Sequence, residues 1–127
     1  MSAHAIRDFE PVPNRPGRTA RDLMGSEQGF ASLFLTETVM QPGSSIPLHT
    51  HSVEEGWVVM AGELEFRVGN DSLAVGAMLS VHVPPGVPHA VVNKGTVAAR
   101  ALTAAPWDRA TFYRYATNYL EGQPRSD

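Results

Sequence analysis

Two histidines one residue apart stand at the start of an apolar run, in the stretch LHTHSVEEGWVVMAG of residues 48–62. Alternate side chains of an extended segment share a face, so His49 and His51 are expected to project together. Glu55 keeps the same parity and Glu54 does not, although a turn after His51 would break that count. Imidazoles and carboxylates are ordinary ligands of transition metals, so this pattern indicates a chelating group.

A third imidazole stands downstream, in the stretch PPGVPHAVVN of residues 84–93. His89 follows a Pro/Gly turn there and begins an apolar run. If this run forms a strand beside the first, three imidazoles and one carboxylate converge. The remaining histidines are weaker candidates, because His4 lies in a polar N-terminal segment and strand parity does not choose a face for His82.

Short β-rich runs separated by glycine and proline turns would position these side chains. From residue 30 onward the runs are FASLFLTETV, GWVVMAG, ELEFRVG, SLAV, MLSVHV, HAVVN and VAARALTAA. Many short strands at close spacing predict an all-β sandwich or barrel, which we place at residues 29–106. Residues 1–28 are polar and interrupted by proline and glycine, and we expect an arm with little regular structure that ends in a short strand at most.

In the C-terminal residues 107–127 the apolar residues recur with a helical period rather than a strand period. This predicts a short helix followed by a tail within the same single domain. Asp108 is the expected N-cap of this helix, and Gly122 is its expected end. One helical face would carry Phe112, Tyr115, Ala116, Tyr119 and Leu120. An aromatic stripe of this kind usually packs against a neighbouring element, so we expect the helix to lie against the barrel or against another subunit.

The composition excludes several classes of function. The chain has 127 residues, enough for one domain, with 43% apolar and 18% charged residues. Its formal net charge of −3 argues against a nucleic-acid partner, because proteins that bind phosphates usually carry an excess of lysine and arginine. The absence of cysteine excludes disulfides, thiol catalysis and thiolate ligands. Neither a signal-peptide core nor a membrane-spanning run is visible, so we expect a cytoplasmic protein without a membrane partner.

The spaced positions resemble the two motifs of the cupin superfamily, in particular its small single-domain proteins of the type-2, conserved-barrel kind. The first motif, G(X)5HXH(X)3,4E(X)6G, is matched by Gly43, His49, His51, Glu55 and Gly62. The second motif ends PXG(X)2H(X)3N and is matched by Pro84, Gly86, His89 and Asn93, with Gly76 as its leading glycine. The interval from His51 to the glutamate and the interval from the glutamate to Gly62 both match the motif at Glu55 and not at Glu54. The resemblance implies a double-stranded β-helix, the jelly-roll barrel of cupins.

The resemblance also implies one divalent transition metal ion, which could be iron, manganese, nickel, zinc or copper, bound by His49, His51, Glu55 and His89. In an octahedral shell two adjacent positions would stay open for water, dioxygen or a bidentate oxygen ligand. An apolar interior would exclude water, and its candidates are Phe34, Trp57, Met60, Phe66, Met78 and Val91. The glycines, the proline and Asn93 of the motifs have structural roles in turns.

A metal-dependent enzyme that acts on a small oxygenated molecule is the favoured function, because an open ligand set is typical of catalytic metal sites. It would be a dioxygenase, or an isomerase or lyase whose metal polarises a carbonyl. Glu55 would be a metal ligand or, swung away, a general base. The alternatives are a non-enzymatic module that binds or senses a small molecule and a structural metal barrel. Small cupins often pair through their sheets, which predicts a homodimer.

Overall fold

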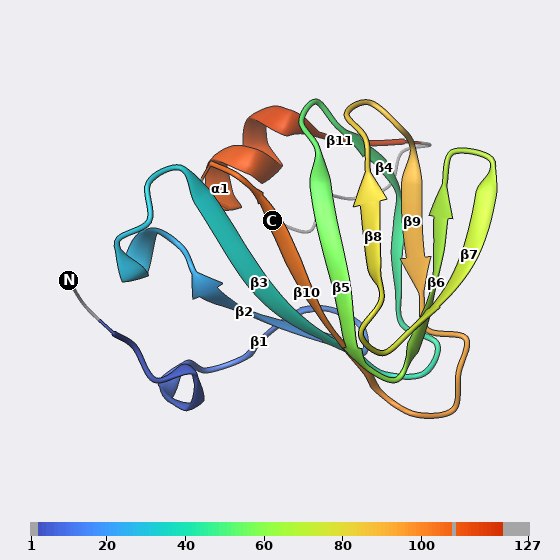
Figure 1. The fold of residues 1–127 in the computed structure, drawn as a ribbon, viewed down its shortest axis with the longest axis horizontal. Coiled ribbons are helices and arrows are strands. Elements are labelled where there is room, and N and C mark those ends of the chain that lie inside the picture. The colour runs from blue at the N-terminus through green and yellow to red at the C-terminus, as the bar shows by residue number, and fades with distance from the viewer. Residues whose placement is uncertain (1–2, 108, 121–127) are drawn as a thin grey trace.

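The computed structural model describes residues 3–107 and 109–120, in which two antiparallel sheets face one another (Figure 1). The strands in chain order are β1 Val12–Arg15, β2 Arg18–Met24, β3 Leu33–Met40, β4 Ser45–His51, β5 Glu55–Ala61, β6 Glu63–Val68, β7 Asp71–Gly76, β8 Ser80–Val83, β9 His89–Val92, β10 Ala99–Pro106 and β11 Thr117–Tyr119. One sheet has the order β1-β2-β3-β10-β5-β8, and the other has the order β11-β4-β9-β6-β7. This arrangement confirms the predicted all-β, jelly-roll fold.

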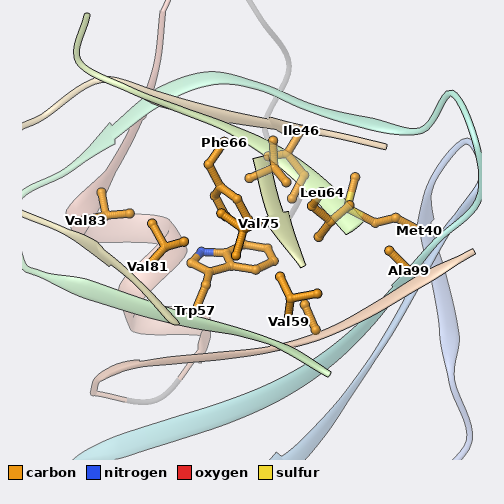
Figure 2. Packing of buried hydrophobic residues seen from close by; sticks show 12 residues of the cluster. Met40, Ile46, Trp57, Val59, Leu64, Phe66, Val75, Val81, Val83 and Ala99 are labelled. Atoms are coloured by element: carbon orange, nitrogen blue, oxygen red, sulfur yellow. The ribbon is translucent and has the colours of Figure 1, made fainter. Parts of the chain in front are cut away.

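The two sheets enclose a core of alternating side chains. Along β10, for example, Ala99, Ala101 and Thr103 are buried while the residues between them are less buried or exposed. This alternation is expected for a strand with one face toward a core. Figure 2 shows the indole of Trp57 near Phe66 and Val75 of the facing sheet and near Val59 and Val81 of its own sheet, and the Trp57 and Phe66 ring centroids lie 5.3 Å apart.

Four of the six predicted interior residues are buried: Phe34, Trp57, Phe66 and Val91. The other two predictions were wrong. Met60 lies on the opposite face of β5 from the buried Trp57 and is only partly buried. Met78 is 72% exposed and has a positive φ of 67°, because it stands in the turn between β7 and β8 rather than in a strand. Sequence hydrophobicity alone could not show which face these residues occupy.

Two motif glycines occupy turns that need a positive φ, as predicted. Gly43 has a φ of 85° and Gly62 has a φ of 75°. At Gly62 a Cβ would lie only 2.8 Å from the carbonyl oxygen of Ala98, so glycine is also required by the close approach of the backbone. Asn93 is buried and donates to the carbonyl oxygens of Met40 and Val97, which confirms that its side chain bonds backbone.

The N-terminal segment contains more regular structure than the sequence predicts. A 3-10 helix (Ile6–Asp8) and a second one (Ser26–Gln28) flank the β1–β2 hairpin, and β2 pairs with β3. Arg21 on β2 contacts Glu37 on β3 at 2.8 Å and donates to two carbonyl oxygens of the first helix and its end. This segment therefore extends the six-stranded sheet instead of remaining an irregular arm.

The C-terminal segment is helical for a shorter stretch than predicted. The helix α1 (Arg109–Thr111) continues as a π-helix (Phe112–Ala116), and Figure 1 shows this helical segment beside the ends of β3 and β10. Residues 117–119 then form β11 rather than the last helical turn, because they pair with the edge of β4. The predicted cap Asp108 and end Gly122 lie outside the described residues. No helix within the described ranges is long and apolar enough to span a membrane.

Candidate metal centre

His49 and His51 lie on the same inward face of β4, as their spacing predicts. Their ring centroids are 4.6 Å apart. The pairing of β4 with β9 shifts its register between Ile46 and His49, so a bulge precedes the two histidines. This bulge changes which positions of β4 face inward, from Ile46 before it to His49 and His51 after it.

His89 enters the same site from β9, where its backbone is paired with that of His49. Its ring centroid lies 4.1 Å from that of His49 and 4.8 Å from that of His51. One ring nitrogen of each of the three histidines lies within 4.8 Å of the other two. All three side chains are buried, with at most 4% of their surface exposed. Three imidazoles from two neighbouring strands therefore converge, as the sequence predicts.

The outward nitrogens of the three rings are held by the protein. His49 Nδ1 lies 2.7 Å from the carbonyl oxygen of Pro47, and His89 Nδ1 lies 2.9 Å from that of Val87. A carbonyl oxygen only accepts, so each of these Nδ1 atoms carries the proton. In a neutral ring the lone pair is then on Nε2. The Nδ1 of His51 lies 2.8 Å from the hydroxyl oxygen of Thr117.

Glu55 begins β5 and brings a buried carboxylate to the three imidazoles. Its Oε2 lies 2.9 Å from His51 Nε2, and its Oε1 lies 3.5 Å from His89 Nε2. The indole Nε1 of Trp57 donates a hydrogen bond to Oε1. The neighbouring Glu54 is exposed and contacts His82 instead. The structure thus places Glu55 beside the histidines and Glu54 away from them.

Burial and the neighbouring charges shift the protonation of this cluster. Burial, followed by the nearby imidazoles of His89 and His51, lowers the pKa of His49 from 6.5 to about 3. For Glu55, burial alone would raise the pKa, but contacts with the imidazoles of His51 and His89 outweigh it and lower the pKa well below 4.5. At neutral pH the centre therefore contains a neutral His49 beside an ionised carboxylate.

The chemistry of the donor set fits a cation. The Nε2 atoms of His51 and His89 are buried and make no well-directed hydrogen bond within the described part of the chain. In neutral rings their lone pairs would face the lone pairs of the Glu55 carboxylate, and two acceptors at 2.9 Å repel each other. A divalent transition metal ion held by these residues would remove this repulsion, since imidazole nitrogens and carboxylates are both ordinary ligands of such ions.

The other two histidines lie outside this centre. His82 is on the outer face of the six-stranded sheet, where it pairs with Glu54 at 2.9 Å, and their side chains are 65% and 69% exposed. Both border an outer groove of about 480 Å³, whose apolar residues include Leu35, Val58 and Leu102. His4 is exposed in the N-terminal segment. Neither His4 nor His82 reaches the buried cluster.

Residue types and spacing did not indicate Thr117 or the role of Phe112. Thr117 holds His51, and the ring of Phe112 packs against the same imidazole with centroids 4.3 Å apart. Both residues belong to the C-terminal segment, which is distant from the histidines in sequence. The one local signal was the pair of strand-forming residues, threonine and tyrosine, within Thr117–Tyr119.

Comparisons with known proteins agree with this architecture. A family model described as "Cupin domain" matches residues 36–105. The tetracenomycin polyketide synthase protein TcmJ of Streptomyces glaucescens is 27% identical over 99 residues, which are 77% of this chain and 66% of that protein. The present chain therefore spans slightly less than two thirds of that relative.

Solved structures show the same fold. The polyketide cyclase RemF from Streptomyces resistomycificus aligns with a TM-score of 0.81 and 23% identity, over 99% of this chain and 89% of that one. KdgF from Halomonas sp. aligns with a TM-score of 0.75 and 12% identity, over 87% and 98% of the two chains. A predicted oxalate decarboxylase from Thermotoga maritima has a TM-score of 0.67 and 22% identity, over 78% and 91%.

Proposed function

Because this chain belongs to the cupin family, we propose that it is a metal-dependent enzyme. One divalent transition metal ion, held by His49, His51, His89 and Glu55, would act as a Lewis acid on a small, enolisable dicarbonyl compound. The observation that carries the proposal is that the buried Nε2 atoms of His51 and His89 approach a buried carboxylate. Among the residues that the structure describes, neither nitrogen makes a well-directed hydrogen bond.

The position of Glu55 favours a ligand role over a general-base role, because its carboxylate is buried against two of the three histidines. Trp57 further restricts this side chain by donating to Oε1, which leaves Oε2 toward His51. Glu55 would therefore stay in place and contribute its negative charge to the centre.

The net charge of the centre suits an anionic oxygen ligand. Three neutral imidazoles and one carboxylate would leave a divalent ion with one net positive charge. When bound, such an ion polarises a carbonyl group and stabilises negative charge on its oxygen. The protein side chains keep bulk water away from the centre, since the histidines and Glu55 are buried and Phe112 covers the ring of His51.

The substrate class is supported by similarity to two proteins whose names refer to polyketides. One is the TcmJ protein of a polyketide synthase, and the other is the polyketide cyclase RemF. Polyketide intermediates carry carbonyls on alternate carbons, and the methylene between two carbonyls loses a proton easily. We therefore prefer Lewis-acid chemistry on a 1,3-dicarbonyl over the dioxygenase reaction that the same ligand set allows.

Metal analysis tests the centre itself. We expect protein purified without added metal to contain about one transition metal ion per chain by mass spectrometry, and His49→Ala and His89→Ala to contain almost none. His82→Ala is the matched control, because that histidine lies on the outer face. Metal content that is unchanged in the two cluster variants, or lowered equally in the control, would contradict the ligand assignment.

Probe substrates then separate the possible activities. Acetylacetone and 2,4,6-heptanetrione would be mixed with the metal-loaded protein while enol absorbance, product mass and dissolved oxygen are recorded. Enolate formation and a cyclised product from the triketone without oxygen uptake support the proposal. Oxygen uptake would make the protein a dioxygenase instead, and binding without turnover would favour a non-enzymatic binding or sensing module.

We also propose that the protein is a cytoplasmic homodimer. The apolar residues of the outer groove, including Leu35, Val58 and Leu102, offer a face through which two copies could pair. Light scattering after size exclusion should give twice the chain mass of 13.7 kDa, and Leu102→Glu should reduce it to the monomer. A monomer in the parent protein would refute the dimer. Fractionation of the cells that produce the protein tests its location.

A further inference from the structure

We propose that Thr117 is a positioning residue for the metal centre, since its hydroxyl accepts the Nδ1 proton of His51 and so directs the Nε2 lone pair of that ring inward. The inference rests on the metal-binding function proposed above. Thr117 is buried at the start of β11, and its Oγ1 lies 2.8 Å from His51 Nδ1. It would act on the metal through His51 and touch neither the ion nor the substrate.

The direction of this hydrogen bond follows from counting protons. A threonine hydroxyl has one proton to donate. Thr117 Oγ1 also lies 3.1 Å from the carbonyl oxygen of Phe112, and this carbonyl oxygen only accepts. The hydroxyl proton is therefore used on Phe112, and the contact with His51 needs a proton from Nδ1. In a neutral ring this leaves Nε2 as the unprotonated donor atom.

The three histidines differ in what holds them. His49 and His89 each contact a carbonyl oxygen only two residues upstream, so their own strands orient them. His51 instead depends on a side chain 66 residues away. Its orientation, and with it one donor atom of the centre, therefore requires the C-terminal segment to be docked.

The C-terminal segment holds Thr117 in place through several contacts. In the β11–β4 pair, Thr117 lies opposite His51, and the backbone N–H of Ser52 donates to the carbonyl oxygen of Ala116 at 2.8 Å. Phe112 contributes twice, because its carbonyl fixes the hydroxyl of Thr117 while its buried ring packs on the imidazole of His51. The π-helix and β11 thus act together on one ligand.

Metal affinity tests this role directly. We would titrate Zn²⁺ against a chelating dye with the full chain as parent, Thr117→Val, Thr117→Ser and Thr38→Val. Loss of an outer partner of a metal ligand commonly weakens binding about 10- to 100-fold, and we expect this for Thr117→Val. The serine variant keeps the hydroxyl and should bind within about threefold of the parent. Thr38→Val is the matched control, because its buried hydroxyl has no hydrogen-bond partner among the described residues.

The protonation of His51 gives a readout that needs no metal. Long-range ¹H–¹⁵N spectra of the metal-free parent should show a proton on His51 Nδ1 that exchanges slowly with water, and Thr117→Ser should retain it. Thr117→Val should lose this protection. If the valine variant does not fold, the parent and serine spectra still decide, because an Nδ1 without a proton would overturn the inference.

The two readouts also separate this inference from the proposed function. A parent that binds no Zn²⁺ but shows the protected Nδ1 proton would overturn the metal-binding function and leave the hydrogen-bond assignment standing. A parent that binds Zn²⁺ no more tightly than Thr117→Val would overturn the positioning role. Equal loss of affinity in Thr117→Val and Thr38→Val would also overturn it, because the effect would then be general to buried threonines.

Discussion

Acidification of the metal-free protein should reduce its stability through His49 before it does so through the buried carboxylate. Burial, with the imidazoles of His89 and His51, lowers the pKa of His49 in the folded protein from 6.5 to about 3. In the unfolded chain this ring takes up a proton below about pH 6.5, whereas in the folded protein it stays neutral. The unfolded state therefore binds more protons, and the free energy of unfolding decreases as the pH falls.

The size of the effect follows from the difference between the two pKa values. Between the unfolded pKa of 6.5 and the folded pKa of about 3, each pH unit costs up to about 1.4 kcal/mol. Acidification from about pH 6.5 to about pH 5 therefore removes about 2 kcal/mol, a large part of an ordinary stability of about 5–15 kcal/mol. Glu55 acts later, because its ordinary pKa is 4.5 and the stability from its lowered pKa is lost only below that value.

Urea unfolding of chelator-treated protein, followed by tryptophan fluorescence from about pH 7 to about pH 5, would measure this dependence. The variant His49→Gln removes the titrating group, so its free energy of unfolding should change less over the same range. His82→Gln is the control and should retain the slope of the parent, because His82 is exposed on the outer face. Equal slopes in His49→Gln and the parent would refute the assignment to His49.

Four further substitutions test the turns, the carboxylate and the core. Gly62→Ala should lose about 2–5 kcal/mol in urea unfolding, from backbone strain and the close carbonyl, whereas Gly43→Ala, with open space at its Cβ, should lose only about 1–2 kcal/mol. Trp57→Phe removes the donor to Glu55 and should weaken Zn²⁺ binding about tenfold in a chelator competition; unchanged affinity would show that this hydrogen bond does not position the carboxylate. Thr38→Val should raise the free energy of unfolding by about 1 kcal/mol, since it removes a buried hydroxyl that has no hydrogen-bond partner among the described residues, and a decrease would contradict this.

Most of the strands could be predicted because each has a local signal. The alternation of apolar residues and the glycine and proline turns mark β5 to β10 within a few residues of their observed bounds. The hairpin Val12–Met24 was harder to predict. Its polar sequence has no strong period, and its strands form because β3 offers an edge for pairing. That information is tertiary and is absent from the local sequence.

The convergence of the histidines could be predicted, but parity explains only part of it. Alternation holds between His49 and His51, where β4 is regular, and fails between Ile46 and His49, where the register shifts. Glu55 reaches the site for a different reason, because it begins β5 in the opposite sheet and shares the inward face of Trp57. The motif spacing selected Glu55 over Glu54 as the candidate ligand, and Glu55 is the one that lies buried beside the histidines, although the count along one strand does not apply to it.

The C-terminal segment shows why a site can depend on residues that a motif does not contain. A helical period over residues 112–120 is present in the sequence, yet Thr117–Tyr119 gains more from the free edge of β4, where its backbone completes a ladder. The same pairing puts a hydroxyl against His51, so the choice between helix and strand at residue 117 affects a nitrogen of the candidate centre. The donors of the centre come from β4, β5 and β9, and β11 orients one of them. Because the donors assemble only when both sheets and this last strand are in place, a bound metal ion would stabilise the whole arrangement and none of its parts alone.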